Sequence, residues 1–306
     1  MDIREIHKSF IDSRFVLILT LLAFLVFRLT ADIGENPFIF WSVALIQMAI
    51  ALLLLFLTQT FIVIRQRTLL PAFFYLLTVG TTPAHFYDLR GSVCALIIVV
   101  CLFLLFSTYQ DKNVQGTAFN FSVLLTLGSL YWLPMLLFFP LFWYGLYHFR
   151  SLNWRTFFAG LMGFPVVYLF LLTWSVHTGD WDFFIDRLPD FKVLYPIHFP
   201  DFSPQEWLKL VFIIFLCILA GFRIFMSGIS EKIRTMAMLS YLYVFAVVVC
   251  LFLFLQLAGK TEWALIVYVP ISFLLAHYFT LSTQKSAGWL LFIVILFFLI
   301  TGFIPG

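Results

Sequence analysis

Long apolar stretches alternate with short polar ones along most of the chain. Because a membrane-spanning helix needs about 20 mainly apolar residues, the pattern predicts about eleven transmembrane helices. The stretches are continuously apolar, whereas the strands of a membrane β-barrel alternate lipid-facing and lumen-facing residues, so helices are expected. The stretches run from Phe15 to Leu29, Phe38 to Ile64, Leu69 to Phe86, Ser92 to Tyr109, Thr117 to Leu133, Met135 to Phe149, Thr156 to Val176, Trp207 to Phe225, Met236 to Leu257, Ala264 to Leu281 and Trp289 to Phe303.

Composition supports this interpretation. The chain of 306 residues is 63% hydrophobic and 11% charged, whereas soluble domains have about 45 to 50% apolar and about 25% charged residues. We therefore expect an all-α, polytopic membrane helix bundle that forms a single transmembrane domain over residues 1–306, with membrane lipids as its surroundings.

Charge predicts the orientation of the bundle. If the N-terminus is cytoplasmic and the stretches cross in alternation, the inner connections hold twelve Lys and Arg and five Asp and Glu, a net charge of +7. The outer connections hold six Lys and Arg and ten Asp and Glu, a net charge of −4. Basic residues favour the cytoplasmic side. We therefore predict a multi-pass protein of a bacterial inner membrane with a cytoplasmic N-terminus, and we expect no nucleic-acid partner.

The one long connection, residues 177–206, is predicted to lie outside the cytoplasm. Within it Trp181, Phe184, Ile185 and Leu188 recur at helical spacing, which indicates an amphipathic helix at the membrane interface. The sequence Ser203-Pro204-Gln205-Glu206 at its end is a capping box, which predicts the start of the next helix.

Candidate chemistry lies in the predicted outer connections. In the first, Arg28 precedes Asp32 and Glu35. A carboxylate there can act as a general base and the guanidinium can hold a phosphate or carboxylate. The alternative is an ordinary solvated loop in which Arg28 extends to the membrane surface.

The second outer connection again sets an acid, Asp88, beside an arginine, Arg90. We assign Asp88 to the candidate catalytic acids, and Arg90, with Arg187 of the long connection, to the candidate substrate-binding cations. Here too, a solvated loop is the alternative.

Other chemistry finds little support in the sequence. The His and Asp residues of the long connection match no compact metal-binding spacing, and no Walker loop, dinucleotide fingerprint or nucleophile elbow occurs. We therefore expect no metal and no cofactor. The cysteines lie within apolar stretches and form no C-x-x-C pair; they are Cys94, Cys101, Cys217 and Cys250.

Two resemblances concern the middle of the chain. The run from Val123 to Pro134, the basic turn from Phe149 to Arg155 and the segment from Gly160 to Pro165 resemble an uncharacterised polytopic membrane-protein family of Bacteroidota. The same region is similar to the C-type glycosyltransferases that use polyprenyl-phosphate sugars. That resemblance implies a catalytic acid in the first outer loop, further acids in the second and a long loop between the seventh and eighth spans. The first outer loop is much shorter here than is usual in that fold.

Three functions follow as hypotheses. The first is a glycosyltransferase-like protein acting on polyprenyl-phosphate-linked substrates at the periplasmic face of the inner membrane. The second is a non-catalytic accessory subunit that packs against another membrane protein of the cell envelope. The third is a transporter of lipids or small molecules, for which we expect charged residues near span midpoints. The chief polar residues there are Gln47, Asn120 and Gln256. We expect their side-chain amides to form hydrogen bonds between helices.

Overall fold

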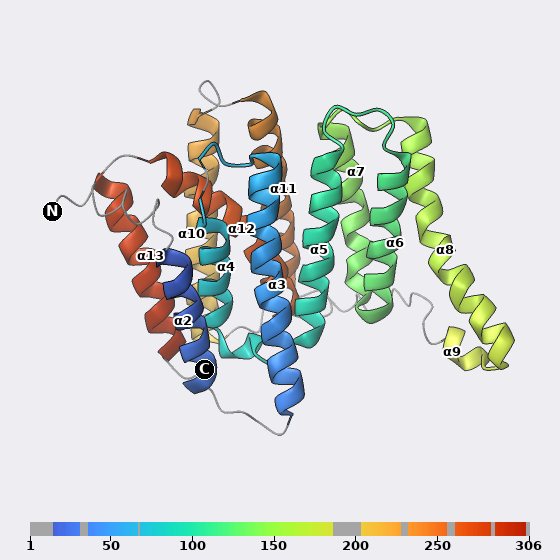
Figure 1. Cartoon of the computed structure of the whole chain (residues 1–306), viewed down its shortest axis with the longest axis horizontal. Coiled ribbons are helices and arrows are strands. Elements are labelled where there is room, and N and C mark those ends of the chain that lie inside the picture. The colour runs from blue at the N-terminus through green and yellow to red at the C-terminus, as the bar shows by residue number, and fades with distance from the viewer. Residues whose placement is uncertain are drawn as a thin grey trace. The chain divides into compact units, whose positions relative to one another are not determined.

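In the part of the chain that it describes, the computed structural model (Figure 1) consists of helices joined by turns and contains no strand. That part comprises residues 15–30, 36–66, 68–185, 203–227, 232–255, 261–282 and 285–303. The helices are α2 (Phe15–Thr30), α3 (Pro37–Phe61), α4 (Leu70–Gly80), η1 (Pro83–His85), α5 (Leu89–Ser107), α6 (Gln115–Tyr131), η2 (Leu133–Leu137), α7 (Phe138–His148), α8 (Trp154–Thr178), α9 (Trp181–Ile185), α10 (Pro204–Ser227), α11 (Ile233–Leu255), α12 (Thr261–Leu281) and α13 (Lys285–Phe303).

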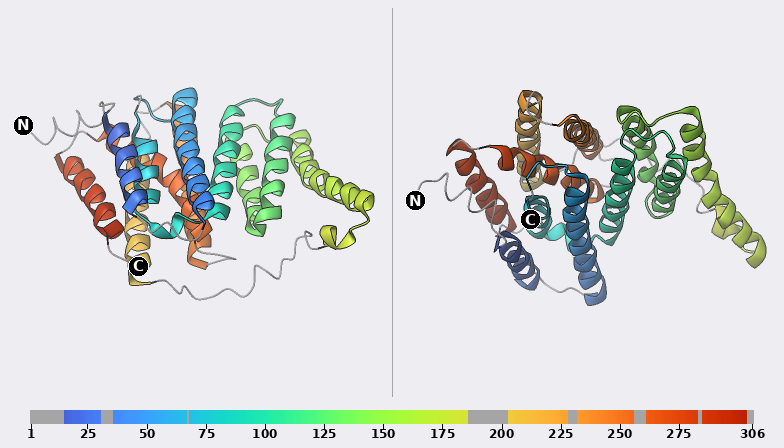
Figure 2. Two further views of the ribbon diagram at one scale, coloured as in Figure 1. Left: turned by 60° about the horizontal axis from the view of Figure 1, so that its bottom comes forward. Right: turned by 45° about the horizontal axis from the view of Figure 1, so that its top comes forward.

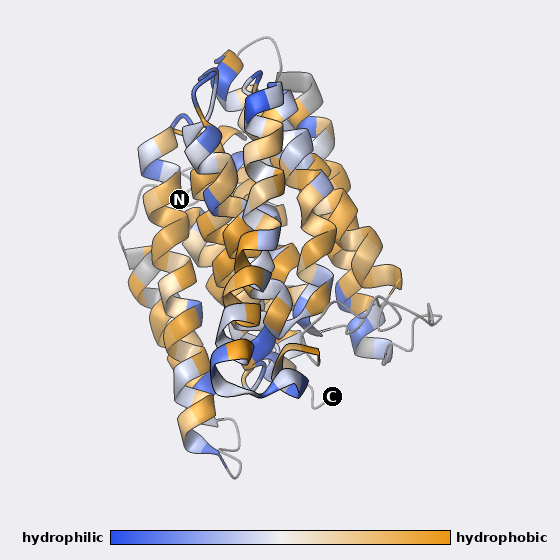
Figure 3. Cartoon of the chain, turned by 90° about the vertical axis from the view of Figure 1, so that its right-hand side faces the viewer, coloured by the Kyte–Doolittle hydropathy of each residue, from blue (hydrophilic) through white to orange (hydrophobic). Residues whose placement is uncertain are grey.

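Each of the expected apolar stretches contains an α-helix, but these helices differ in length. The stretch from Leu69 to Phe86 is divided into α4 and η1, and the stretch from Met135 to Phe149 begins in η2 and continues as α7. Within the described ranges, six are long and apolar enough to cross a membrane, namely α3, α5, α8, α10, α11 and α12. Shorter apolar helices occupy Thr20–Thr30, Leu70–Gly80 and Ser286–Gly302. In Figure 3 the hydrophobic colour follows the helices and hydrophilic positions gather at helix ends. A helical membrane protein is thus supported, whereas eleven complete spans are not.

The chain divides into two compact units, and the boundary falls within α5. Unit 1 comprises Met1–Leu96, Phe199–Leu255 and Gly259–Gly306, and unit 2 comprises Ile97–His198 and Gln256–Ala258. Each unit is described by itself below.

Helix α12 is the central helix of unit 1. It packs against α4, α10 and α11, and 83% of its most apolar window is buried, the largest share among the candidate spans of the described chain. A helix that is apolar on all sides is stable only when other helices or lipid surround it. Figure 2 shows α3, α4 and α10 to α13 as neighbouring helices of this unit.

In unit 2, α6 and α8 pack at close range. Gly163 of α8 faces Ser122 and the backbone of α6, where a Cβ atom would lie 2.7 Å from Ser122 Cβ and 2.8 Å from the carbonyl oxygen of Phe119. Small residues let membrane helices approach in this way. After α6 the chain continues through η2, which packs against both α6 and α7.

Local sequence signals set several helix starts. At α10 the backbone N–H of Ser203 donates to Glu206 Oε2 at 2.8 Å, and the N–H of Glu206 donates to Ser203 Oγ at 3.3 Å, which confirms the capping box. Asn153 caps α8 by accepting from the N–H of Thr156 at 2.8 Å. Of the predicted amphipathic helix, the structure shows the short helix α9, Trp181–Ile185. Its position at the membrane interface stays a prediction, and residues 186–202 lie outside the described part.

Candidate functional site

Arg28 lies in the interior of unit 1. Its side chain is fully buried, and it donates through Nη1 to the carbonyl of Phe40 at 2.5 Å and through Nη2 to Gln47 Oε1 at 2.7 Å. The rings of Phe24, Phe40 and Phe86 lie 4.7 to 5.4 Å from Cζ, within the range of cation–π attraction. The interpretation of Arg28 as a residue that extends to the membrane surface is therefore wrong. Its role in binding substrate stays a prediction.

Gln47 extends this network across unit 1. Its Nε2 donates to the carbonyl of His85 at 3.1 Å and to Ser92 Oγ at 3.4 Å. Because Arg28, Gln47 and Ser92 belong to α2, α3 and α5, the network joins three helices to η1. The expectation of bonds between helices is confirmed for Gln47. Asn120 is exposed on α6, and Gln256 lies outside the described residues.

At the end of unit 1 where α5, α10 and α12 begin, which we call the polar end, four side chains form an acid cluster: Asp88, Arg90, Thr261 and Glu262. Arg90 Nη1 lies 3.8 Å from Glu262 Oε1, and Thr261 Oγ1 donates to Glu262 Oε2 at 3.1 Å. Arg90 is 54% exposed and Glu262 is 11% exposed. The structure therefore brings together two of the predicted site residues, Asp88 and Arg90, and adds Glu262.

Asp88 has a structural task and an unusual acidity. Its Oδ1 accepts from the backbone N–H of Gly91 at 2.7 Å, which caps the start of α5. Burial raises the pKa of Asp88, and the negative charge of Glu262 raises it further, against the lowering effect of the Gly91 N–H and of Arg90. A carboxyl group with a raised pKa exchanges its proton closer to neutral pH, as general acid–base catalysis requires.

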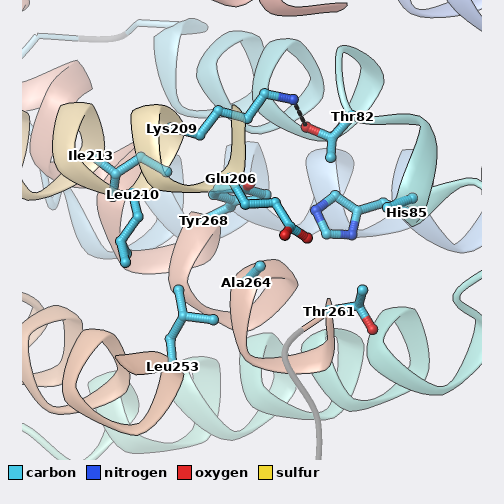
Figure 4. A pocket seen from close by; sticks show the side chains of 11 residues that line it. Thr82, His85, Glu206, Lys209, Leu210, Ile213, Leu253, Thr261, Ala264 and Tyr268 are labelled. Atoms are coloured by element: carbon cyan, nitrogen blue, oxygen red, sulfur yellow. Dashed lines mark hydrogen bonds between the residues drawn. The ribbon is translucent and has the colours of Figure 1, made fainter. Parts of the chain in front are cut away.

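Beside the acid cluster is a small cavity, the polar pocket, of about 60 Å³. Its polar lining consists of Thr82, His85, Glu206, Lys209, Thr261 and Tyr268, and apolar residues of α10, α11 and α12 complete the wall. Thr261 belongs both to the acid cluster and to the lining of the polar pocket. Figure 4 shows the carboxylate of Glu206 and the imidazole of His85 pointing toward one another, while the ammonium of Lys209 points to Thr82.

Lys209 is a buried cation. The residue is only 9% exposed, and Nζ donates to Thr82 Oγ1 at 3.2 Å and to the carbonyl of Thr81 at 3.4 Å. Because ionisable groups near hydrocarbon are costly, they tend to face a cavity or a partner. The burial of Lys209 therefore favours a role for the polar pocket in binding a ligand.

His85 is the second buried polar residue of the pocket. It is 2% exposed, its ring meets that of Tyr268 edge to face at 5.6 Å, and Nδ1 has no hydrogen-bond partner within the described chain. Burial, helped by the positive charge of Lys209, lowers the pKa of His85 to about 3. The imidazole is thus neutral and offers one nitrogen to a ligand or a water molecule.

Three predicted site residues, Asp32, Glu35 and Arg187, lie outside the described residues. Their predicted roles stay predictions. Among the described residues no three His, Cys, Asp or Glu side chains gather in a way that could hold a metal ion.

Sequence reasoning did not single out His85, Glu206 and Lys209 as a site. His85 stands three positions before Asp88, the first residue of the predicted acid–arginine pair. Glu206 is predicted only as part of the helix cap. A usable signal was the charge of Lys209 three residues after Glu206 at the start of an apolar helix, because such charges near a membrane boundary often face a cavity.

Comparison with known proteins identified no relative of this chain. No protein-family model matches the chain, and no curated protein or solved structure matches it.

Proposed function

We propose that this chain is an inner-membrane protein that acts on a polyprenyl-phosphate-linked substrate at its extracytoplasmic face, in the manner of C-type glycosyltransferases. In this proposal the eleven apolar stretches cross the bilayer, the N-terminus is cytoplasmic and the polar end of unit 1 faces outward. The acid cluster is the observation that supports the proposal, because it joins carboxyl groups and an exposed guanidinium contributed by two separate connections.

The residues of the cluster fit the steps of a glycosyl transfer. A carboxylate, Asp88 or Glu262, takes the proton of the acceptor hydroxyl as the acceptor oxygen bonds to the anomeric carbon. The bond between that carbon and the phosphate oxygen breaks, and Arg90 neutralises the leaving polyprenyl phosphate. Asp32 and Glu35 are further candidates for the base, and Arg28 and Arg187 are further candidates for phosphate binding.

Complementation of a deletion strain tests the proposal. The deletion is expected to change the envelope glycans and to accumulate the lipid-linked donor. Asp88→Asn and Glu262→Gln keep hydrogen-bond acceptors in place but cannot take up a proton, so at least one of them is expected to fail to restore the glycans. Asp111→Asn changes an exposed acid of unit 2 and is expected to restore them. If both cluster variants restore wild-type glycans, the cluster is not the catalytic site.

The accessory-subunit hypothesis is supported by one observation in unit 2. Only 22% of the most apolar window of α8 is buried, the smallest share among the candidate spans of the described chain, and Trp154, Phe170 and Trp174 are exposed on it. Such a surface fits lipid or a second membrane protein. Mild-detergent purification separates the two: a stoichiometric protein partner that is lost on Phe170→Ser supports the accessory role, and a single purified chain contradicts it.

A further inference from the structure

The polar pocket presents two opposite charges at separate positions. Lys209 and Glu206 lie one turn apart on α10 and both line the pocket, yet the ammonium points to Thr82 and the carboxylate points to His85 (Figure 4). A purely anionic ligand held by Lys209 would therefore lie near a carboxylate, and a purely cationic ligand would lie near the lysine. A ligand that carries both charges satisfies both ends.

His85 favours a hydrogen-bond donor at the Glu206 end. Its buried Nδ1 has no partner within the described chain, and its ring faces into the pocket beside the carboxylate. A buried polar atom without a partner costs free energy unless water or a ligand satisfies it. A primary ammonium brings three N–H donors, enough for both Glu206 and His85.

A second cavity in unit 1 is apolar. It encloses about 190 Å³ between α2, α4 and α13, and residues lining it include Phe24, Phe27, Leu76 and Leu299. Apolar cavities of roughly 150 Å³ hold a molecule as large as benzene, so this one, the apolar pocket, has room for a segment of hydrocarbon chain.

The two pockets are lined by consecutive residues just after the end of α4. Thr81 lines the apolar pocket and Thr82 lines the polar pocket, and Lys209 bonds to both residues. From Thr81 the apolar pocket follows α4 back to Phe73, which is about 12 Å at 1.5 Å per residue. A chain that starts at the polar pocket would take this direction into the hydrocarbon layer.

We propose that these two pockets bind one phospholipid whose headgroup carries a phosphate and a primary ammonium. The phosphate lies at Lys209 and Thr82, the ammonium lies between Glu206 and His85, and an acyl chain fills the apolar pocket. The quaternary ammonium of a choline headgroup has no N–H to donate, and a glycerol headgroup has no positive charge for Glu206. The site therefore distinguishes three common headgroups.

This inference concerns residues other than the proposed catalytic acids, and it can fail or hold independently of the transferase proposal. Its test is equilibrium binding by native mass spectrometry of the delipidated full-length protein. The probes are dioleoyl phosphatidylethanolamine, phosphatidylcholine and phosphatidylglycerol. We expect the ethanolamine lipid to bind about tenfold more tightly than the other two, since one charge-assisted hydrogen bond is worth about that factor.

Two variants divide the headgroup site. Glu206→Gln keeps an acceptor for the helix cap but removes the negative charge, so we expect the preference for the ethanolamine lipid over the glycerol lipid to vanish. Lys209→Met keeps the apolar stem and is expected to weaken all three lipids by about tenfold. Lys112→Met removes an exposed lysine of unit 2 and is expected to leave both affinity and preference unchanged.

A third variant tests the apolar pocket. Ala23→Leu places a larger side chain in its wall and is expected to weaken all three lipids without changing their order. Equal binding of the three lipids to the wild-type protein would overturn the proposal. So would a Glu206→Gln protein that keeps the ethanolamine preference. Should Lys209→Met not fold, Thr82→Val replaces it, with the expectation of a smaller loss for all three lipids.

Discussion

The contact between α6 and α8 allows a sharp prediction about glycine. At Gly163 a methyl group would lie 2.7 Å from Ser122 Cβ, 2.8 Å from the carbonyl oxygen of Phe119 and 3.2 Å from the backbone nitrogen of Val123. Two of these neighbours are backbone atoms, so the helices must separate to admit Ala. Overpacking costs about 1 to 3 kcal/mol, and the better helix propensity of Ala returns up to about 1 kcal/mol.

We therefore expect Gly163→Ala to lower the free energy of unfolding by about 1 to 2 kcal/mol. Gly116 of α6 is the matched control, because a methyl group there meets no atom within 4 Å, and Gly116→Ala is expected to be neutral or slightly stabilising. Gly160 is intermediate, since its nearest neighbour is the side-chain Nε1 of Trp143 at 3.1 Å. Equilibrium unfolding of the purified protein in detergent measures all three. Equal stability of the Gly163 and Gly116 variants would refute the close approach of the helices.

Three further predictions concern buried polar groups of unit 1. Arg28→Met removes the donor to Gln47 and to the carbonyl of Phe40 and should cost about 3 kcal/mol of stability, measured by the same unfolding assay, whereas Arg28→Lys should cost less. His85 has a pKa of about 3 when folded against about 6.5 unfolded, so its contribution to stability is complete above pH 6.5 and is lost as the pH falls from there toward 3. The expected slope is at most about 1.4 kcal/mol per pH unit, and His85→Asn should flatten a plot of thermal midpoint against pH. Asp88→Ala should lose about 1 kcal/mol with the cap of α5, while Asp88→Asn should retain it; equal losses would contradict the capping role.

The helices of this protein could be predicted from sequence because their signal is local. Each apolar stretch excludes other structures by its own length and composition, and the capping box at Ser203 and Glu206 marks a helix start within four residues. The lengths were less predictable. The predicted stretch from Met135 to Phe149 begins within η2, which starts at Leu133 and Pro134, and continues as the short α7. Pro134 stands where α6 has ended, as expected of a residue that cannot donate a backbone hydrogen bond inside a helix.

The candidate site was less accessible to sequence reasoning because its residues come from distant parts of the chain. Lys209 bonds to Thr82, which is 127 positions away, and no periodic pattern connects them. The pair Asp88 and Arg90 was visible as an acid beside an arginine, but its neighbour Glu262 starts a helix far along the chain. The burial of Arg28 could not be predicted either. In sequence it stands beside a polar connection, but in the fold the rings of Phe24, Phe40 and Phe86 surround it and its side chain is fully buried.

The Arg28 network and the polar pocket share one residue, His85, and this makes their coupling testable. The backbone carbonyl of His85 accepts from Gln47, while its ring lines the pocket. Gln47→Leu removes the bond that holds η1 in place, so we expect the ring to gain access to water and its pKa to return toward its usual value.

The loss of stability between pH 7 and pH 5 should then be smaller in Gln47→Leu than in the wild-type protein, in addition to a lower thermal midpoint at pH 7. Asn120→Leu replaces an exposed amide of α6 and should leave the pH dependence unchanged. A Gln47→Leu protein with a lower midpoint but the wild-type pH dependence would show that the network stabilises unit 1 without positioning His85. Because the carbonyl and the ring belong to one residue of a three-residue helix, a shift of the first should move the second.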